Sequence, residues 1–264
     1  MKQTVFAVVI AILATIAGNA SSSSADNYLT GGDFLIRNVT VVDGLGNKPQ
    51  VGQDILIRGG KIASITGAGT SQPPSGARVI EGNGLTAMPG LIDAHTHIRT
   101  QWHGGLVLQD KYPQNRQHKN LQQNLAAYLY AGVTGIFNVG DPDPAEYSVK
   151  IDTGDPEALG KMMIGGTDSP AYPTLWAGES MHRELELMVM AGISPLDAIK
   201  SCTYNGAKIM RGEARYGSPQ TGMEADLMLV KGRPWKNISD TRNIQQVFLK
   251  GKLVDRDKLL QSWR

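Results

Sequence analysis

Short β-strand patterns occupy both ends of the chain, and this division most constrains how the chain can fold. Residues 33–66 consist of short β-strand patterns separated by turns, and the pair Gly59 and Gly60 is typical of a hairpin turn. Residues 225–232 and 245–255 also show short β-strand patterns, near the other end of the chain. Each end alone has too few strands to cover its own edges and faces. We therefore expect the two ends to pair into one small β-sandwich.

Between these ends the pattern changes to alternating strands and helices. Residues 89–95 and 133–141 predict strands, and residues 114–132 predict a helix between them. Residues 180–192 and 194–210 each predict one further amphipathic helix. Such alternation is typical of a parallel sheet, in which functional side chains gather at the carboxyl ends of the strands.

The stretch PGLIDAHTHI contains an aspartate and two histidines at every second position. Because successive side chains of a strand point to opposite faces, Asp93, His95 and His97 share one face. Two imidazoles on one rigid strand suit two ligands of one metal ion. Residues 161–170 predict another strand that ends at Asp168. We therefore predict a metal site at the sheet rim formed by His95, His97 and Asp168, although the TDSP context of Asp168 also suits a turn.

The other notable polar residues have plainer interpretations. Asp93 lies deeper than the two histidines and is expected to support the site rather than to bind the metal. His182 could contact substrate, but capping or packing is the favoured role. His103 and His118 are interpreted as loop or solvent residues. Cys202 lies in a helical pattern and is expected to be a buried thiol.

Composition limits the function classes. The net charge is +2 and the basic residues are scattered, so no footprint for nucleic acid is present. A single cysteine excludes an intramolecular disulfide. Residues 1–25 combine Lys2, an apolar run and a small polar segment, which predicts a secretory signal peptide, with an uncleaved anchor as the alternative. Either predicts export to a periplasm or the exterior, and cleavage would leave no stable membrane span.

Several motifs together resemble a known family. These are TAMPGLIDAHTHI, IGGTDSP, HRELELMVMAGISPLDAIKSCTYNGAKIM, GMEADLMLVKGRPW and VFLKGKLVDR. Their order closely resembles the metal-dependent amidohydrolase superfamily, in particular its imidazolonepropionase- and prolidase-like branch. The resemblance implies an α/β fold: a (β/α)8 TIM-type barrel with a small β-sandwich built from both termini. On this basis residues 26–88 and 218–264 would form the sandwich, and residues 89–217 a partial hydrolase barrel.

The resemblance also implies a reaction. Family members hold one or two divalent metal ions, and zinc is the expected ion here. The histidine pair comes from the first barrel strand and the aspartate from the last, so Asp168 would be both a metal ligand and the catalytic group that takes a proton from water. The expected substrates are small amides, dipeptides or cyclic amides.

The spacing departs from the family pattern. Only 73 positions separate His95 from Asp168, whereas about 30 residues per barrel unit would require roughly 200. The barrel is therefore expected to be incomplete, with the break within residues 141–160. Lys150 is a weak match to the family's bridging lysine, and an exposed lysine is the favoured reading. Two alternatives follow: an exported hydrolase, active when shortened or completed by self-association, or an inactive deletion remnant or pseudoenzyme.

Overall fold

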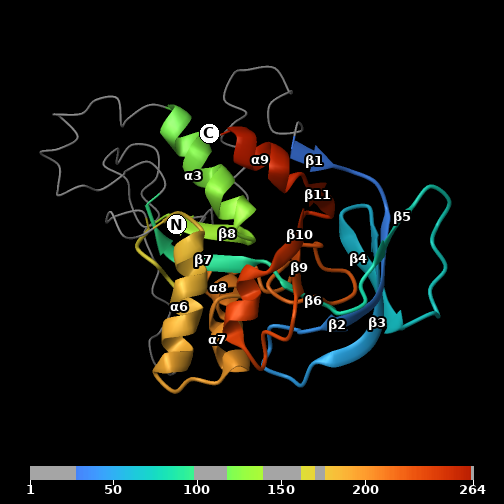
Figure 1. The fold of residues 1–264 in the computed structure, drawn as a ribbon, viewed down its shortest axis with the longest axis horizontal. Helices are drawn as coiled ribbons and strands as arrows, with labels where there is room; N and C mark the ends of the chain where they lie inside the picture. The colour runs from blue at the N-terminus through green and yellow to red at the C-terminus, as the bar shows by residue number, and fades with distance from the viewer. Residues whose placement is uncertain (1–27, 98–117, 139–161, 170–175, 263–264) are drawn as a thin grey trace, which may run out of the picture.

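The computed structural model describes residues 28–97, 118–138, 162–169 and 176–262. The predicted signal peptide at residues 1–25 and the predicted break at residues 141–160 lie outside the described residues. The described part is a mixed α/β structure with one large sheet, one small parallel sheet and a group of helices (Figure 1).

Strands from both ends of the chain form one sheet. Its nine described strands are β1 (Leu29–Thr30), β2 (Phe34–Val41), β3 (Gln50–Arg58), β4 (Lys61–Gly67), β5 (Arg78–Glu81), β6 (Leu85–Pro89), β9 (Leu227–Lys231), β10 (Ile244–Leu249) and β11 (Lys252–Val254). The strand order is β1-β11-β10-β9-β6-β2-β3-β4, with β5 beside β2. The two ends join where β6 pairs antiparallel with β9. Strands of the two ends therefore pair as predicted, but within one continuous sheet, and the predicted β-sandwich and its domain boundaries stay predictions.

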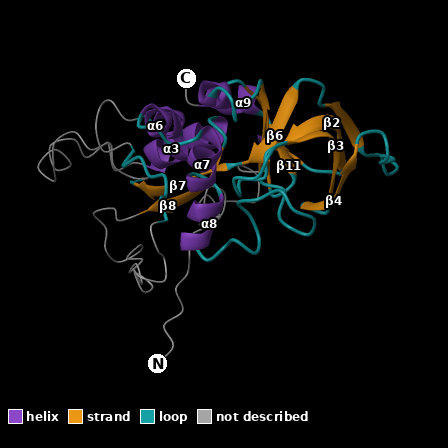
Figure 2. Ribbon diagram, turned by 90° about the horizontal axis from the view of Figure 1, so that it is seen from below, coloured by secondary structure: helices purple, strands orange, loops and turns teal. Residues whose placement is uncertain are grey.

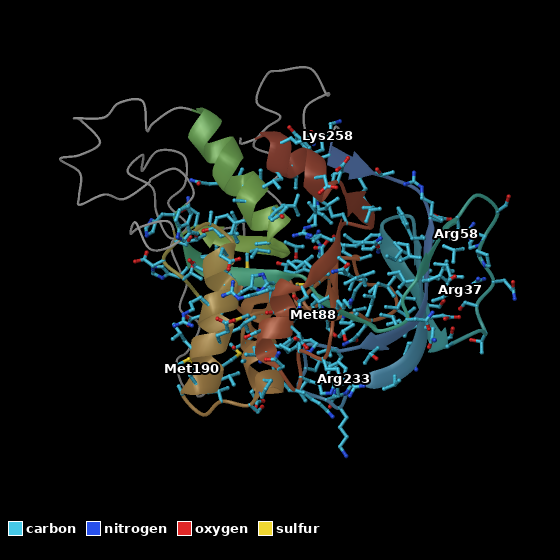
Figure 3. The ribbon with its side chains drawn as sticks, in the orientation of Figure 1. Arg37, Arg58, Met88, Met190, Arg233 and Lys258 are labelled. Carbon is cyan, nitrogen blue, oxygen red and sulfur yellow. The ribbon has the colours of Figure 1, made fainter. Side chains whose placement is uncertain are left out.

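The central strand β9 is apolar along most of its length because it separates two cores. Leu227 and Leu229 pack into a cluster enclosed by the large sheet. Met228 and Val230, on the opposite face, pack into the cluster beneath the helices. The side chains of its partner β6 also alternate between the two cores: Ala87 packs into the cluster enclosed by the large sheet, and Met88 lies between the helices and the sheet (Figure 3). Burial on both faces explains a continuous apolar run where one-sided strands alternate.

The large sheet curls over its own core. The rings of Phe34 on β2 and Phe248 on β10 meet edge to face, with centroids 5.1 Å apart, although other strands separate β2 from β10 in the sheet. The predicted hairpin is present between β3 and β4, where Gly59 and Gly60 have φ angles of 57° and 82°. Two successive positive φ angles are the requirement of a type I′ turn, which glycine meets without strain.

The small sheet contains β7 (Leu91–Thr96) and β8 (Val133–Asn138), which pair in parallel. Pro89 and Gly90 carry the chain directly from β6 of the large sheet into β7. Gly90 is required there, because a Cβ atom would lie 2.2 Å from the Thr134 hydroxyl oxygen. Strand β6, which separates the two cores, and the tight contact at Gly90 together fix where β7 begins.

Helices surround the small sheet. They are α3 (His118–Tyr130), α6 (Glu179–Met190), α7 (Pro195–Ser201) and α8 (Tyr204–Ile209), while the 3-10 helix η4 (Ile238–Arg242) and α9 (Arg256–Ser262) accompany the C-terminal strands. Figure 2 shows α3, α6, α7 and α8 grouped with β7 and β8, to one side of the large sheet. Among the described residues, no helix has both the length and the apolar character needed to cross a membrane.

The predicted single helix at residues 194–210 is wrong, because the chain forms α7 and α8 with a break at Cys202 and Thr203. The Thr203 hydroxyl donates to the carbonyl of Ile199, and its backbone leaves helical geometry with φ −134°. Such local hydrogen bonds compete with a continuous helix. The predicted start is correct, since the Ser194 hydroxyl caps the Asp197 amide at 3.1 Å.

A buried carboxyl directly before β9 of the large sheet predicts a pH-dependent stability. Burial raises the pKa of Asp226 to about 7, although its Oδ1 accepts a 2.5 Å hydrogen bond from the Lys250 amide. The folded chain therefore keeps a proton that the unfolded chain releases near pH 4. As the pH rises from about 4 to about 7, the free energy of unfolding is expected to decrease by roughly 1.4 kcal/mol per pH unit for this proton. Urea unfolding of Asp226→Asn should show a shallower pH slope, and an unchanged slope would contradict the assignment.

Candidate metal centre

Strand β7 changes from buried to exposed along the face that carries the predicted site. Asp93 is fully buried, whereas 54% of the His95 side chain is exposed to solvent. His97 directly follows the strand, and 22% of its side chain is exposed. The two imidazoles therefore stand at the carboxyl end of β7, accessible to water and to small molecules. This is the location that the alternating pattern predicts.

Residues 162–169, here called the aspartate segment, run alongside β7. The Asp168 amide donates to the His95 carbonyl at 2.8 Å, and the His97 amide donates to the Ser169 carbonyl at 3.0 Å. Thr96 and Ser169 form an isolated parallel bridge. The predicted strand is thus an extended segment with a single bridge rather than a regular strand. Its hydrogen bonds place Asp168 beside both histidines.

The three predicted ligands come together in space. The carboxylate Oδ1 of Asp168 lies 3.0 Å from Nε2 of His97 and 3.5 Å from Nε2 of His95. One potential ligand atom from each residue lies within 4.8 Å of the others. Two imidazole nitrogens and one carboxylate oxygen are a donor set that zinc and similar divalent ions bind in proteins. The residues therefore fit such an ion, and its binding stays a prediction.

The backbone around Asp168 has two special features that the sequence alone does not reveal. Asp168 has a φ of 57°, a left-handed conformation that aspartate and asparagine adopt more readily than most residues. At Gly166 a Cβ atom would lie 2.7 Å from the Cβ of His95. Only glycine therefore allows the aspartate segment to lie this close to β7. Both features aim the Asp168 carboxylate at the imidazoles.

Asp93 links β7 to the aspartate segment, and its role in supporting a metal ion stays a prediction. One carboxylate oxygen accepts hydrogen bonds from the Thr167 amide at 3.0 Å and from the His95 amide at 3.2 Å, and the other accepts from the Thr167 hydroxyl at 2.5 Å. Burial raises the pKa of Asp93 to about 7, and the Thr167 hydrogen bonds partly offset that effect. Asp93 thus ties the segment that carries Asp168 to the strand that carries the histidines.

Two other residues behave as predicted. His182 is buried and packs within the fold, with Nε2 2.9 Å from the Ala131 carbonyl and Nδ1 3.0 Å from the Thr241 hydroxyl. Desolvation lowers the pKa of His182, so a neutral ring that donates to Ala131 and accepts from Thr241 fits this environment. Cys202 is a fully buried free thiol whose pKa burial raises, so it is not an activated nucleophile.

A cavity of about 270 Å³ opens beside the aspartate segment. Thr167 lines it together with Trp176 and one side of α6, including Glu184. None of the three predicted ligands lines this cavity, so it is distinct from the candidate metal centre. It adjoins that centre through Thr167, the neighbour of Asp168.

Some predictions fall on parts of the chain that the structure does not describe. His103 and Lys150 lie outside the described residues, and the His118 side chain is not described either. Their predicted roles stay predictions. Thr167, in contrast, is a supporting residue that the sequence analysis missed. A possible signal was its place directly before Asp168, but threonine is common in turns and therefore marks no site.

The fold and the site together define a class of α/β protein: two β-rich ends share a sheet, and a parallel strand pair presents two histidines opposite an aspartate. Comparison with known proteins is consistent with this class. The profile of the amidohydrolase family matches residues 154–254. A dihydroorotase from Elusimicrobium minutum is 44% identical over 66 residues, which are 25% of this chain and 14% of that enzyme. Residues 154–254 are therefore similar to the amidohydrolase family, and the chain spans only about a seventh of the length of the curated relatives it matches.

Solved structures support the same fold at low sequence identity. A molinate hydrolase structure aligns with a TM-score of 0.71 and 13% identity, covering 87% of this chain and 96% of the other. An adenosine deaminase from Xanthomonas campestris with bound zinc aligns with a TM-score of 0.62 and 12% identity, covering 88% and 97%. The chain is therefore similar in fold to these two solved structures, while the predicted incomplete barrel stays a prediction.

Proposed function

We propose that this chain is a divalent-metal-dependent hydrolase that cleaves carbon–nitrogen bonds of small amides, dipeptides or cyclic amides. The observation that carries this proposal is the convergence of His95, His97 and Asp168 at one rim of the parallel sheet. The family profile and the similarity to a dihydroorotase support it. Zinc is the proposed ion, and the neighbouring deaminase structure with bound zinc supports that choice.

Three residues of the chain would bind the ion, and one of them would also transfer the proton. His95 and His97 would hold the ion through their imidazoles, and Asp168 through its carboxylate. Such an ion supplies Lewis acidity, which makes water a nucleophile near neutral pH and withdraws electrons from a substrate carbonyl. Asp168 accepts the proton of the attacking water while the carbon–oxygen bond forms. It then donates that proton to the departing nitrogen as the carbon–nitrogen bond breaks.

Two further proposals concern context. The apolar run between Lys2 and the small polar segment of residues 1–25 supports export to the periplasm or the exterior after signal cleavage. The short spacing between His95 and Asp168 supports a partial barrel that a second copy of the chain completes, so a homo-oligomer is proposed. The same spacing favours the second candidate function, an inactive member of the family whose remaining barrel strands fold without catalysis.

Metal content decides between the two candidates. Purified wild-type protein is expected to contain on the order of one equivalent of zinc or a similar ion, because three convergent ligands make a catalytic-type site. His97→Ala should lose most of it, measured by inductively coupled plasma mass spectrometry. Less than about a tenth of an equivalent in the wild type would favour the inactive member. Light scattering on the same sample should show a discrete oligomer, whereas a polydisperse aggregate would contradict completion by self-association.

A further inference from the structure

The carbonyl of Ser169, one residue beyond Asp168, receives two side-chain hydroxyl groups. The Tyr128 hydroxyl, from α3, donates to it at 2.9 Å. The Thr96 hydroxyl oxygen, from β7, lies within hydrogen-bond distance of both the Ser169 carbonyl and the Tyr128 hydroxyl. All three residues are fully buried. The two hydroxyls therefore have no access to water as an alternative partner.

The number of donors makes the arrangement a connected network. A carbonyl oxygen has two lone pairs, and the His97 amide already uses one of them. One hydroxyl takes the other lone pair, and the second hydroxyl then donates to the first. Burial raises the pKa of the Tyr128 phenol above its usual value, so the group keeps the proton that it donates. Loss of either hydroxyl would leave the Ser169 carbonyl with one hydroxyl partner instead of two, and the network would hold it less firmly.

Neither hydroxyl touches the candidate metal centre directly. Thr96 lies between His95 and His97 in sequence, so its side chain points to the opposite face of the strand. Tyr128 belongs to α3, whose Leu125 and Leu129 are buried in the core beneath the helices. The helix is therefore a fixed support on the far side of β7 from the imidazoles.

We propose that Tyr128 and Thr96 are positioning residues for Asp168: their paired hydroxyls fix the Ser169 carbonyl and thereby hold Asp168 in its left-handed turn toward His95 and His97. The inference rests on the proposed function in that it treats Asp168 as a metal ligand. Asp93 fixes the aspartate segment at Thr167, and the hydroxyl pair fixes it at Ser169. Asp168 is thus held from both sides.

A matched pair of tyrosine variants tests the proposal. Tyr128→Phe should weaken the affinity for Co²⁺ by about tenfold, a typical effect of losing a group that orients a ligand. Tyr130→Phe removes the same atom from the same helix, where the Tyr130 ring packs under the Arg256 guanidinium at 4.2 Å, and should bind Co²⁺ like the wild type. Titration against a chromophoric chelator measures both. Equal affinity of Tyr128→Phe and Tyr130→Phe would overturn the proposal.

A second comparison separates positioning from general destabilisation. Thr96→Ser keeps the hydroxyl and should keep Co²⁺ affinity, whereas Thr96→Val keeps the shape and should lose it. Without metal, Tyr128→Phe should accelerate amide hydrogen exchange at His97, whose amide donates to the Ser169 carbonyl. If the wild type binds no Co²⁺, the proposed function fails, and the exchange measurement alone decides the positioning role. An unchanged exchange rate at His97 would then overturn it.

Discussion

Asp168→Asn is expected to reduce hydrolysis of the proposed amide substrates by about 10²- to 10⁴-fold, the usual contribution of a positioned proton acceptor. Asparagine has nearly the same shape but cannot accept the proton of the attacking water. It also tolerates the left-handed backbone at this position, where φ is 57°. The variant should therefore fold like the wild type, and loss of activity would report chemistry rather than unfolding.

The measurement is the initial rate on a panel of dipeptides and cyclic amides, together with metal content and melting temperature. His95→Ala should also abolish activity, because it removes a predicted ligand. His118→Ala, at the start of α3, should leave the rate unchanged. Comparable losses in all three variants would mean that destabilisation was being measured. Full activity in Asp168→Asn would exclude Asp168 as the proton acceptor.

The sequence predicted the elements of the fold whose cause is local or periodic. The hairpin at Gly59 and Gly60 follows from two adjacent glycines, and the alternation of Asp93, His95 and His97 follows from strand geometry. The pairing of the two ends follows from strands that would otherwise have bare edges. These predictions succeed because each depends on neighbouring residues or on a general property of sheets.

The supporting contacts of the site were not predictable in the same way. The Asp93 carboxylate meets Thr167 across 74 sequence positions, and Tyr128 meets Ser169 across 41. Threonine and tyrosine are common residues, and nothing in their local pattern marks them as partners of an aspartate turn. The break between α7 and α8 was missed because the apolar periodicity continues through it, while the hydrogen bond of Thr203 interrupts the helix. Tertiary hydrogen bonds overrule local periodicity in these places.

Asp93→Ala is expected to cause the largest loss of stability among the site variants. It removes the acceptor for the Thr167 amide, the Thr167 hydroxyl and the His95 amide in a fully buried place. Each buried donor without a partner costs about 1–3 kcal/mol. The sum, several kcal/mol, is a large share of the roughly 5–15 kcal/mol that keeps a typical domain folded. Urea unfolding should show the loss as a lower transition midpoint.

Asp93→Asn is the matched control, because it keeps the shape and one acceptor oxygen. That oxygen can still accept from the Thr167 and His95 amides, and the Thr167 hydroxyl can rotate to accept from the new amide group. We expect a loss below about 1.5 kcal/mol, within the net value of one hydrogen bond. Metal affinity should also decrease more in Asp93→Ala than in Asp93→Asn, because Asp168 comes directly after Thr167. If asparagine destabilises as much as alanine, the carboxylate charge rather than the hydrogen-bond pattern holds the aspartate segment against β7.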